Sequence, residues 1–301
     1  MSSFLILKFC EMKKFNNGRL KIGIQKNGRL TEQTIDLLKR SGFEFDAYGR
    51  RLFSTCRNFP LEILFLRDDD IPEYVQDSVC DLGIVGENVV KEKMAKVEVV
   101  EKLGFGMCRI CLAVPRNSGI EKIKELNGKR IATSYPNVLE QFLEKKRVIS
   151  EIVEVSGAVE ITPSLQVAEA ICDVVSTGTT LRTNGLRVLD EVLESEALLI
   201  GNLKSMNKQQ KILERFLMRL RGTLVARKNR YVMMNAPKSS LEKIRKILPG
   251  LSSPTVLPLA EQDMIAVHSV VPEQVFWEVM ERLKEAGASG ILVTPIEKMI
   301  L

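Results

Sequence analysis

Hydrophobic and polar residues follow two different periods along the first two thirds of the chain. Short apolar runs with strand periodicity are each followed by a turn and then by helical periodicity. The first such unit is a strand at Leu20-Lys21-Ile22-Gly23-Ile24 and a helix that begins near Thr31 and stops at Gly42. This alternation predicts α/β domains with mostly parallel sheets, whose ligands bind beyond the carboxyl ends of the strands. Further strands are predicted at 61–66, 81–85, 109–114, 130–133 and 172–175.

The last third of the chain has a different order of elements. A charged helical pattern from Asn207 to about Arg227 is typical of a connector, with apolar residues on one face only. The segments after it predict the βαββαβ order of a ferredoxin-like domain. Such a domain can be a packing domain or an effector sensor, and the pattern leaves both open. The predicted elements are a strand at 231–235, a helix at 240–248, strands at 255–259 and 264–270, a helix at 273–286 and a strand at 290–295.

Composition limits the class of protein. With 301 residues, 45% hydrophobic and 27% charged, the chain is typical of a globular protein of two or three domains. The net charge of +6 is spread along the chain and aromatic residues are few, which argues against a nucleic-acid partner. No apolar run is long enough to span a membrane, and the opening Phe4-Leu5-Ile6-Leu7 run lacks the features of a secretory signal. A cytoplasmic location is therefore predicted.

The sequence gives little support for metal binding, redox chemistry or catalysis by cysteine or histidine. The six cysteines stand mostly in apolar surroundings, as reduced thiols do. Cys108-Arg109-Ile110-Cys111 lies in an apolar strand, which favours packing over zinc or redox chemistry. The one histidine, His268, also lies in a strand-like run and is interpreted as structural.

A strand that ends in a loop of glycine and hydroxyl residues carries the main chemical signal. After Ile171-Cys172-Asp173-Val174-Val175 come Ser176-Thr177-Gly178-Thr179-Thr180, which open a helix. Backbone N–H groups at such a helix start can surround a phosphate, and a glycine lets the backbone approach it. No lysine follows Gly178, so the loop suits one phosphate monoester and not a triphosphate. The loop alone fits an ordinary capped helix equally well.

Two carboxylates are expected near this loop. A helix is predicted from Pro163-Ser164 through Ile171 and carries Glu169, while Asp173 stands at the start of the strand. Such acids can bind ribose hydroxyls, directly or through hydrated Mg2+. For Glu169, a solvated position on the helix surface is the favoured alternative.

This segment resembles the 5-phosphoribosyl-diphosphate loop of the long form of ATP phosphoribosyltransferase. The resemblance runs from Asp173 to Leu181 and continues through Arg182-Thr183-Asn184-Gly185-Leu186. Thr179 stands where alanine is common in the family, and residues 1–19 match nothing in it. Similar blocks recur in family order at Gln25-Lys26-Asn27-Gly28-Arg29-Leu30, Arg67-Asp68-Asp69-Asp70-Ile71-Pro72, Asp81-Leu82-Gly83-Ile84-Val85-Gly86-Glu87-Asn88, Gly128-Lys129-Arg130-Ile131-Ala132-Thr133-Ser134-Tyr135-Pro136 and Pro295-Ile296-Glu297-Lys298-Met299.

The resemblance implies a two-lobed catalytic part like a type II periplasmic binding protein, followed by an ACT-like, ferredoxin-like regulatory domain. The chain would cross into the second lobe near Phe105 and return near Gly185. The implied parts are an N-terminal extension at 1–19, lobe I at 20–104 and 185–206, lobe II at 105–184, a connecting helix at 207–230 and the regulatory domain at 231–301.

The family joins N1 of ATP to the ribosyl carbon of phosphoribosyl diphosphate and releases pyrophosphate, which opens histidine biosynthesis. The resemblance further implies Mg2+, inhibition by histidine, and homo-oligomers that are dimers and hexamers. The reaction requires alignment and neutralisation of the departing charge more than acid–base groups. Lys26, Arg51 and Arg67 are the catalytic candidates, and Arg29 joins them as a cation for ATP, because all four fall at strand ends or in the following loops.

Further ATP contacts are expected at Asp69, Asp81, Gly86 and Tyr135. Each has a structural alternative. Asp70 with Glu73 is interpreted as a reciprocal helix cap, so at least one acid of the Asp68–Asp70 run is structural. The run from Asp81 to Gly86 could be a simple tight turn, and Tyr135 could pack at a helix start before Pro136. The metal ligands are not predicted.

The main rival hypothesis is a binding protein without catalysis. A solute-binding bilobal protein would carry a signal peptide, and none is recognised. A nucleotide-sensing regulatory subunit would have a damaged phosphate loop or lack the basic residues, and both are intact in the sequence. The sequence therefore favours the enzyme.

Overall fold

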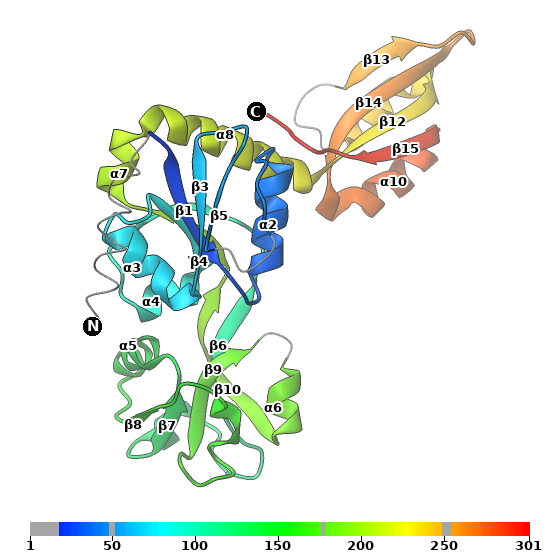
Figure 1. Cartoon of the computed structure of the whole chain (residues 1–301). Helices are drawn as coiled ribbons and strands as arrows, with labels where there is room; N and C mark the ends of the chain where they lie inside the picture. Colours follow the sequence, from blue (N-terminus) through cyan, green and yellow to red (C-terminus); the bar gives the residue numbers. More distant parts are fainter. Residues whose placement is uncertain (1–17, 48–51, 176–177, 249–253) are drawn as a thin grey trace. The chain divides into compact units, whose positions relative to one another are not determined.

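The computed structural model describes residues 18–47, 52–175, 178–248 and 254–301 (Figure 1). Its residues form two compact units. The first contains residues up to Asp36 and from Phe43 to Leu213, and the second contains Leu37–Gly42 and Glu214–Leu301. Among the residues that the structure describes, no helix combines the length and the apolar character needed to cross a membrane.

The first unit contains two lobes, and lobe I is built on a six-stranded sheet of order β2-β3-β1-β4-β11-β5. Strands β1, β3 and β4 are parallel, whereas β11 runs antiparallel to β4 and β5. The strands are β1 (Leu20–Gln25), β2 (Phe53–Thr55), β3 (Leu61–Leu66), β4 (Leu82–Gly86), β5 (Glu98–Lys102) and β11 (Ala197–Gly201); the helices are α2 (Thr31–Arg40), η2 (Asp68–Asp70), α3 (Ile71–Gln76), α4 (Glu87–Glu92) and α7 (Leu203–Lys208).

Lobe II is built on a five-stranded sheet of order β10-β6-β9-β7-β8. Here β7, β8 and β9 are parallel, and β6 runs antiparallel to both β9 and β10. The strands are β6 (Cys108–Pro115), β7 (Arg130–Thr133), β8 (Glu151–Glu154), β9 (Ala170–Val175) and β10 (Leu186–Ser195); the helices are η3 (Ile123–Leu126), α5 (Pro136–Lys146), η4 (Val159–Ile161) and α6 (Thr179–Thr183).

Both lobes repeat one topology. In each sheet the first parallel strand lies between the second and the third, as β3-β1-β4 in lobe I and β8-β7-β9 in lobe II. The strand beside the third one, β11 or β6, runs antiparallel to it and comes from the other lobe. This is the arrangement of type II periplasmic binding proteins, so the predicted fold class of the first unit is confirmed. The predicted return of the chain near Gly185 is wrong, because β10 completes the lobe II sheet and the chain returns at Glu196.

The second unit carries the ferredoxin-like domain. Its antiparallel sheet has the order β13-β14-β12-β15, and its elements follow each other as βαββαβ, as predicted. Side chains of Val232, Met234 and Val267 on one sheet face pack with Ile244 and Leu283 of the helices. The elements are α8 (Gln210–Arg227), β12 (Asn229–Pro237), η5 (Lys238–Ser240), α9 (Leu241–Ile247), β13 (Thr255–Pro258), β14 (Met264–Pro272), η6 (Glu273–Val275), α10 (Phe276–Glu285) and β15 (Ser289–Pro295).

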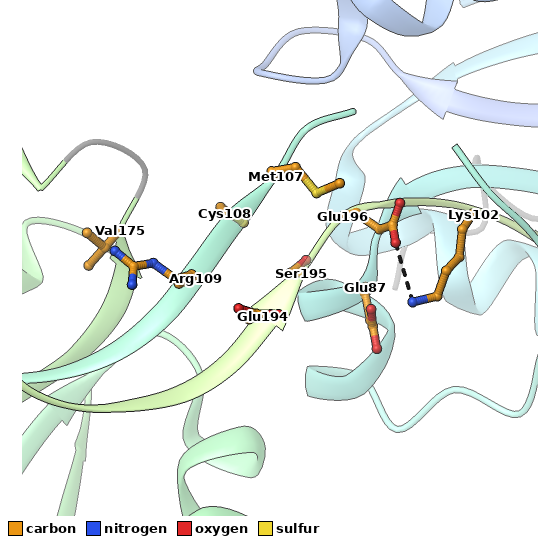
Figure 2. A pocket seen from close by; sticks show the side chains of 9 residues that line it. All are labelled: Glu87, Lys102, Met107, Cys108, Arg109, Val175, Glu194, Ser195 and Glu196. Atoms are coloured by element: carbon orange, nitrogen blue, oxygen red, sulfur yellow. Dashed lines mark ion pairs between the residues drawn. The ribbon is translucent and has the colours of Figure 1, made fainter. Parts of the chain in front are cut away.

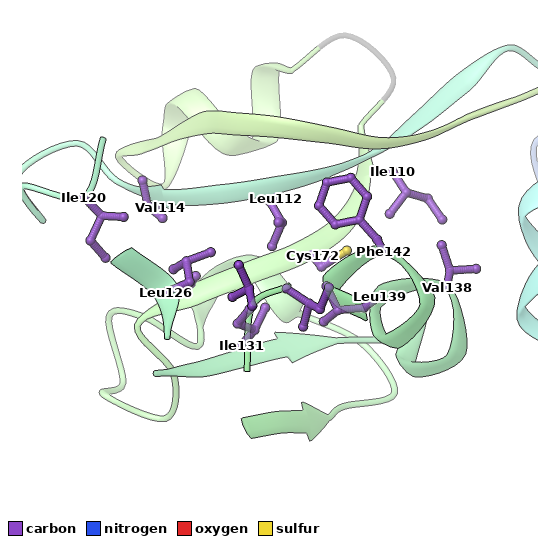
Figure 3. Packing of buried hydrophobic residues seen from close by; sticks show 13 residues of the cluster. Ile110, Leu112, Val114, Ile120, Leu126, Ile131, Val138, Leu139, Phe142 and Cys172 are labelled. Atoms are coloured by element: carbon purple, nitrogen blue, oxygen red, sulfur yellow. The ribbon is translucent and has the colours of Figure 1, made fainter. Parts of the chain in front are cut away.

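The core of lobe II shows how α5 is held on its sheet (Figure 3). Leu139, Phe142 and Leu143 share one helix face and pack on residues of β6, β7 and β9. Pro136 starts the helix at its first position, and Arg147 ends it with a left-handed φ of 56°. This packing fixes the start of α5, where Tyr135 lies.

Two local predictions are wrong. Residues 162–167 form turns in place of the predicted helix from Pro163 to Ile171, and Ala170 already pairs with Ile131 in the sheet. Strand pairing overrides the helical preference of this short segment. The reciprocal cap at Asp70 is also absent, since Asp70 ends the short helix η2 in a helical conformation and makes no side-chain cap hydrogen bond.

We predict that Gly83→Ala lowers the free energy of unfolding by about 1–3 kcal/mol, because overpacking a filled core costs that much. An alanine Cβ at this β4 position would lie 2.6 Å from Ile71 Cγ2 and 2.9 Å from Val75 Cγ2 of α3. Gly157→Ala is the matched control, since its Cβ would meet nothing within 4 Å. Denaturant unfolding of both variants measures the difference, and equal stabilities would refute the close approach of α3 to β4.

Candidate functional site

Three predicted site residues of lobe I, Lys26, Arg67 and Asp69, follow the carboxyl ends of its central strands. Lys26 follows β1 and donates its backbone N–H to Leu66 O at 2.8 Å, while Arg67 follows the neighbouring strand β3. Because β1 and β3 are parallel and in register at Gln25 and Leu66, both cations stand at the same sheet edge. Lys26 is half-buried, whereas Arg67 and the nearby Asp69 are exposed.

Arg29, in the loop after β1, reaches lobe II. Its Nη2 atom lies 3.7 Å from Cys108 Sγ at the start of β6. Its charge also acts on two lobe II groups, lowering the pKa of Tyr135 and of Asp173 against the larger effect of their burial. Arg29 therefore links lobe I to the start of β6 and acts electrostatically on Asp173 in β9.

A cavity of about 420 Å3 opens where the two lobes join (Figure 2). Its volume is within the range of small-molecule sites. Lys102 and Glu196 form an ion pair of 3.3 Å on its wall. None of its lining residues was predicted as a site residue, because the sequence did not show where the chain returns from lobe II. They are Glu87, Lys102, Met107, Cys108, Arg109, Val175, Glu194, Ser195 and Glu196.

Tyr135 lies at the start of α5, and its hydroxyl group contacts lobe I. Burial raises the pKa of Tyr135 to about 12, so the phenol stays protonated at neutral pH. Its oxygen lies 3.1 Å from Asn88 Nδ2, which donates to it from lobe I. The hydroxyl proton can then be donated to a ligand.

Asp173 occupies β9 three residues before the loop. Burial raises the pKa of its carboxyl group, and the Val174 N–H, 2.7 Å from Oδ1, partly offsets this. A carboxylate whose ionisation is opposed by burial, near a cation such as Arg29, is typical of functional sites.

After β9 the described residues resume at Gly178, at the N-terminus of α6. Gly178 has a left-handed φ of 72° directly before α6. A Cβ built there would lie 3.8 Å from Arg182 Nη1 and from Val175 Cγ1, an ordinary contact distance, so the backbone angle explains the glycine. Thr179 and Thr180 are exposed, and Thr179 Oγ1 accepts from Arg182 Nη2 at 3.2 Å. Ser176, Thr177 and Arg51 lie outside the described residues.

Asp81 does not belong to this site. It precedes β4, at the opposite end from Gly86, and its Oδ2 accepts from Lys21 N–H at 2.7 Å and from Gln209 Nε2 at 3.0 Å. The buried carboxylate thus ties β4 to β1 and to the residue that follows α7. The prediction that Asp81 contacts ATP is wrong.

Glu169 is likewise at the wrong end of its strand. It precedes β9, six residues and about 20 Å along the strand from the loop. Its carboxylate binds Arg130 at 2.6 Å, and this pairing lowers the pKa of Glu169 to about 2. The prediction that Glu169 approaches the phosphate is therefore contradicted.

Gly86 ends β4 and begins α4 with close packing. A Cβ at Gly86 would collide with the side-chain oxygen of Asn88. This contact explains the glycine without a ligand, and the predicted approach of ATP to Gly86 stays a prediction.

The fold and this arrangement define a two-lobed α/β protein with cations at strand ends and a left-handed glycine after β9, followed by a ferredoxin-like domain. Residues 67–222 match the family described as ATP phosphoribosyltransferase, and residues 226–298 match the C-terminal domain described for HisG. The chain belongs to the ATP phosphoribosyltransferase family, in its long form, and is a transferase.

Individual relatives agree with this. An ATP phosphoribosyltransferase of Cytophaga hutchinsonii is 48% identical over 93% of this chain and 98% of that protein. One of Bacteroides thetaiotaomicron is 47% identical over 94% of this chain and 100% of that protein. A solved chain of the ATP phosphoribosyl transferase (HisG:HisZ) complex of Thermotoga maritima is 29% identical, with a TM-score of 0.61 over 68% of this chain and 98% of that one.

We predict that Asp81→Ala lowers the free energy of unfolding by about 1–3 kcal/mol, the usual cost of leaving buried donors unpaired. Asp77→Ala, which removes an exposed carboxylate just after α3, is the control and should change stability by less than about 0.5 kcal/mol. The KM for ATP should stay within about twofold of the wild-type value in both variants. A selective rise in that KM for Asp81→Ala would return the residue to the site.

Proposed function

We propose that the chain transfers the 5-phosphoribosyl group of phosphoribosyl diphosphate to N1 of ATP, as the first step of histidine biosynthesis. The products would be N1-(5-phosphoribosyl)-ATP and pyrophosphate. The observation that carries the proposal is the left-handed Gly178 loop beside Asp173, with Arg29 of the other lobe acting on the same carboxylate. Family membership supports the reaction, and a cytoplasmic location stays a prediction.

Phosphoribosyl diphosphate would bind to lobe II. Its 5-phosphate fits the loop from Ser176 to Thr180, where backbone N–H groups and hydroxyl groups can surround a monoester. Asp173, on the strand that leads into this loop, would accept hydrogen bonds from the ribose hydroxyls. Arg182 adds a positive charge at the loop through its contact with Thr179.

ATP would bind mainly to lobe I. Four cations would neutralise its phosphates and the departing pyrophosphate, namely Lys26, Arg29, Arg51 and Arg67. We also assign Asp69, which follows β3, to ATP. Tyr135 would face the adenine with its ring and donate its hydroxyl proton. Placing the two substrates on different lobes brings N1 against the ribosyl carbon only when the lobes are correctly aligned.

The transfer itself needs little proton chemistry. The N1 lone pair forms the new bond to C1 of the ribose while the bond from C1 to the pyrophosphate oxygen breaks. The ring gains oxocarbenium character, and negative charge accumulates on the leaving pyrophosphate. Lys26, Arg29, Arg51 and Arg67 would stabilise that charge through electrostatic interaction.

Mg2+ would bind to this site together with the diphosphate group of the substrate. Within the described ranges, no group of three or more His, Cys, Asp or Glu side chains could hold a metal ion. Mg2+ is commonly held by substrate phosphates, waters and only one or two carboxylates, which suits such a site. Asp173 is the carboxylate that we assign to it, and the ion would neutralise charge on the pyrophosphate.

The first test mixes the full chain with ATP, phosphoribosyl diphosphate and Mg2+, with pyrophosphatase present to remove pyrophosphate. We expect the absorbance to change as the substituted adenine forms. Gly178→Val should reduce product formation at least about 100-fold, because a β-branched residue resists the left-handed angle. Affinity for ATP should change little.

Gly157→Val provides a matched control in the same lobe, since this glycine has open space around it and no left-handed angle. Calorimetry with phosphoribosyl diphosphate completes the comparison. A folded Gly178→Val variant that binds this substrate normally would refute the assignment of the loop.

We also propose that the ferredoxin-like unit binds histidine and inhibits the transfer, in a homo-oligomer that includes dimers and hexamers. The unit has its own core, and the solved relative from Thermotoga maritima aligns with only 68% of this chain. An effector can inhibit from a separate site only if it binds one state of the enzyme better than another. The coupling must then be equal in both directions at equilibrium.

We predict that saturating ATP and phosphoribosyl diphosphate weaken histidine binding by a finite factor, about 5- to 150-fold, that stops growing once both substrates saturate. Calorimetry at increasing substrate concentrations measures this factor, and D-histidine serves as the control. A histidine Kd that rises without limit as ATP increases would show direct competition and would place histidine in the catalytic cleft.

A further inference from the structure

The two lobes are joined by a narrow connection. The chain crosses between β5 and β6 and returns between β10 and β11. Backbone hydrogen bonds link these crossings, from Leu103 N–H to Ala197 O at 3.0 Å and from Ala197 N–H to Phe105 O at 2.9 Å. A two-stranded connection of this kind can bend, so another contact must hold the lobes at the distance that transfer requires.

Helix α5 of lobe II has no cap of its own. Its N-cap residue, Tyr135, makes no side-chain cap hydrogen bond. Pro136 has no backbone N–H, so the open donors of the first three helical positions are those of Asn137 and Val138. A helix start with such donors requires acceptors from elsewhere.

Glu92, the last residue of α4 in lobe I, supplies these acceptors. Its Oε1 accepts from the Asn137 N–H at 3.1 Å, and its Oε2 accepts from the Val138 N–H at 3.0 Å. The Asn137 side chain donates back to Glu92 O at 2.9 Å and to Oε1 at 3.1 Å. One carboxylate thus satisfies both open donors and stands at the positive end of the α5 dipole.

Asn88, one helical turn before Glu92 on α4, makes the second part of this connection. Its N–H donates to Ser195 Oγ at 3.0 Å, and Ser195 Oγ donates to Asn88 Oδ1 at 2.9 Å. Its Nδ2 then donates to Tyr135 Oη at 3.1 Å. Asn88 and Ser195 are each only 4% exposed, so these bonds are shielded from water.

We propose that Asn88 and Glu92 form an interlobe clasp, in which lobe I caps α5 and thereby positions lobe II for phosphoribosyl transfer. The inference rests on the proposed function, since it assigns the clasp to the alignment of the two substrates. Glu92 is a positioning residue and acts through α5 and Tyr135. Opening the lobes would remove the cap from α5 and the Asn88 donor from Tyr135 together.

The first experiment compares Glu92→Ala with Glu140→Ala in the full chain. Glu140 is an exposed carboxylate on α5, away from the first turn, and its loss should leave kcat unchanged. Glu92→Ala should lower kcat about 10- to 100-fold through misalignment, while the KM for phosphoribosyl diphosphate stays within about twofold. Glu92→Gln should be intermediate, because it keeps one acceptor and presents an amide donor to the other N–H.

Amide hydrogen exchange of the same variants supplies a readout that does not depend on activity. Asn137 and Val138 should exchange faster in Glu92→Ala and at the wild-type rate in Glu140→Ala. Unchanged exchange at these two amides, or a wild-type kcat with faster exchange, would overturn the clasp. If the wild-type chain makes no product, the proposed function fails, and the exchange experiment still decides whether Glu92 caps α5.

Discussion

The antiparallel pairing of the strands that cross between the lobes is the constraint on which the site depends. β11 returns from lobe II to pair with β4, and β6 leaves lobe I to pair with β9. The carboxyl ends of β4 and β9 therefore point toward the crossing from opposite sides. Gly86 and Val175 end these two strands. The same pairing builds the cavity, because residues of β6 and β10 line it between the lobes.

Several polar groups at this junction are buried at a cost to stability. Burial raises the pKa of Asp173 and of Tyr135, so desolvation opposes the ionised form of each. Asn88 and Ser195 are compensated by their reciprocal hydrogen bonds, and among the described residues Asp173 accepts from the Val174 N–H and is affected by the charge of Arg29.

The sequence predicted the helices and strands well where a short-range pattern alone determines the element. The βα units, the βαββαβ domain and the glycine at the loop after β9 all have short-range signals, and the structure confirms them. The return of the chain was misplaced because β10 carries no local mark of the lobe to which it belongs. The helix predicted up to Ile171 failed because pairing with β7 decides the conformation of that segment.

The two misplaced carboxylates have a common cause. Asp81 and Glu169 both stand just before a strand, so they lie at its amino end, where ligands of parallel α/β sheets do not bind. Both acids were assigned to the site because they are close in sequence to blocks typical of the family. The predicted strand boundaries already placed them before their strands. Each acid instead bonds a backbone N–H at the start of the adjacent strand, Lys21 or Arg130. Their roles are structural because the end of the strand determines which environment a side chain enters.

The sequence did not predict how α5 is capped, because its N-cap residue is Tyr135 and not a typical capping residue. A serine or aspartate at the N-cap would satisfy the first turn locally. The position is instead occupied by Tyr135, which makes no side-chain cap hydrogen bond, and lobe I provides the cap through Glu92. The capping of α5 and the contact between the lobes therefore depend on the same few hydrogen bonds. A conformational change that separates the lobes must therefore leave the first turn of α5 without its acceptors.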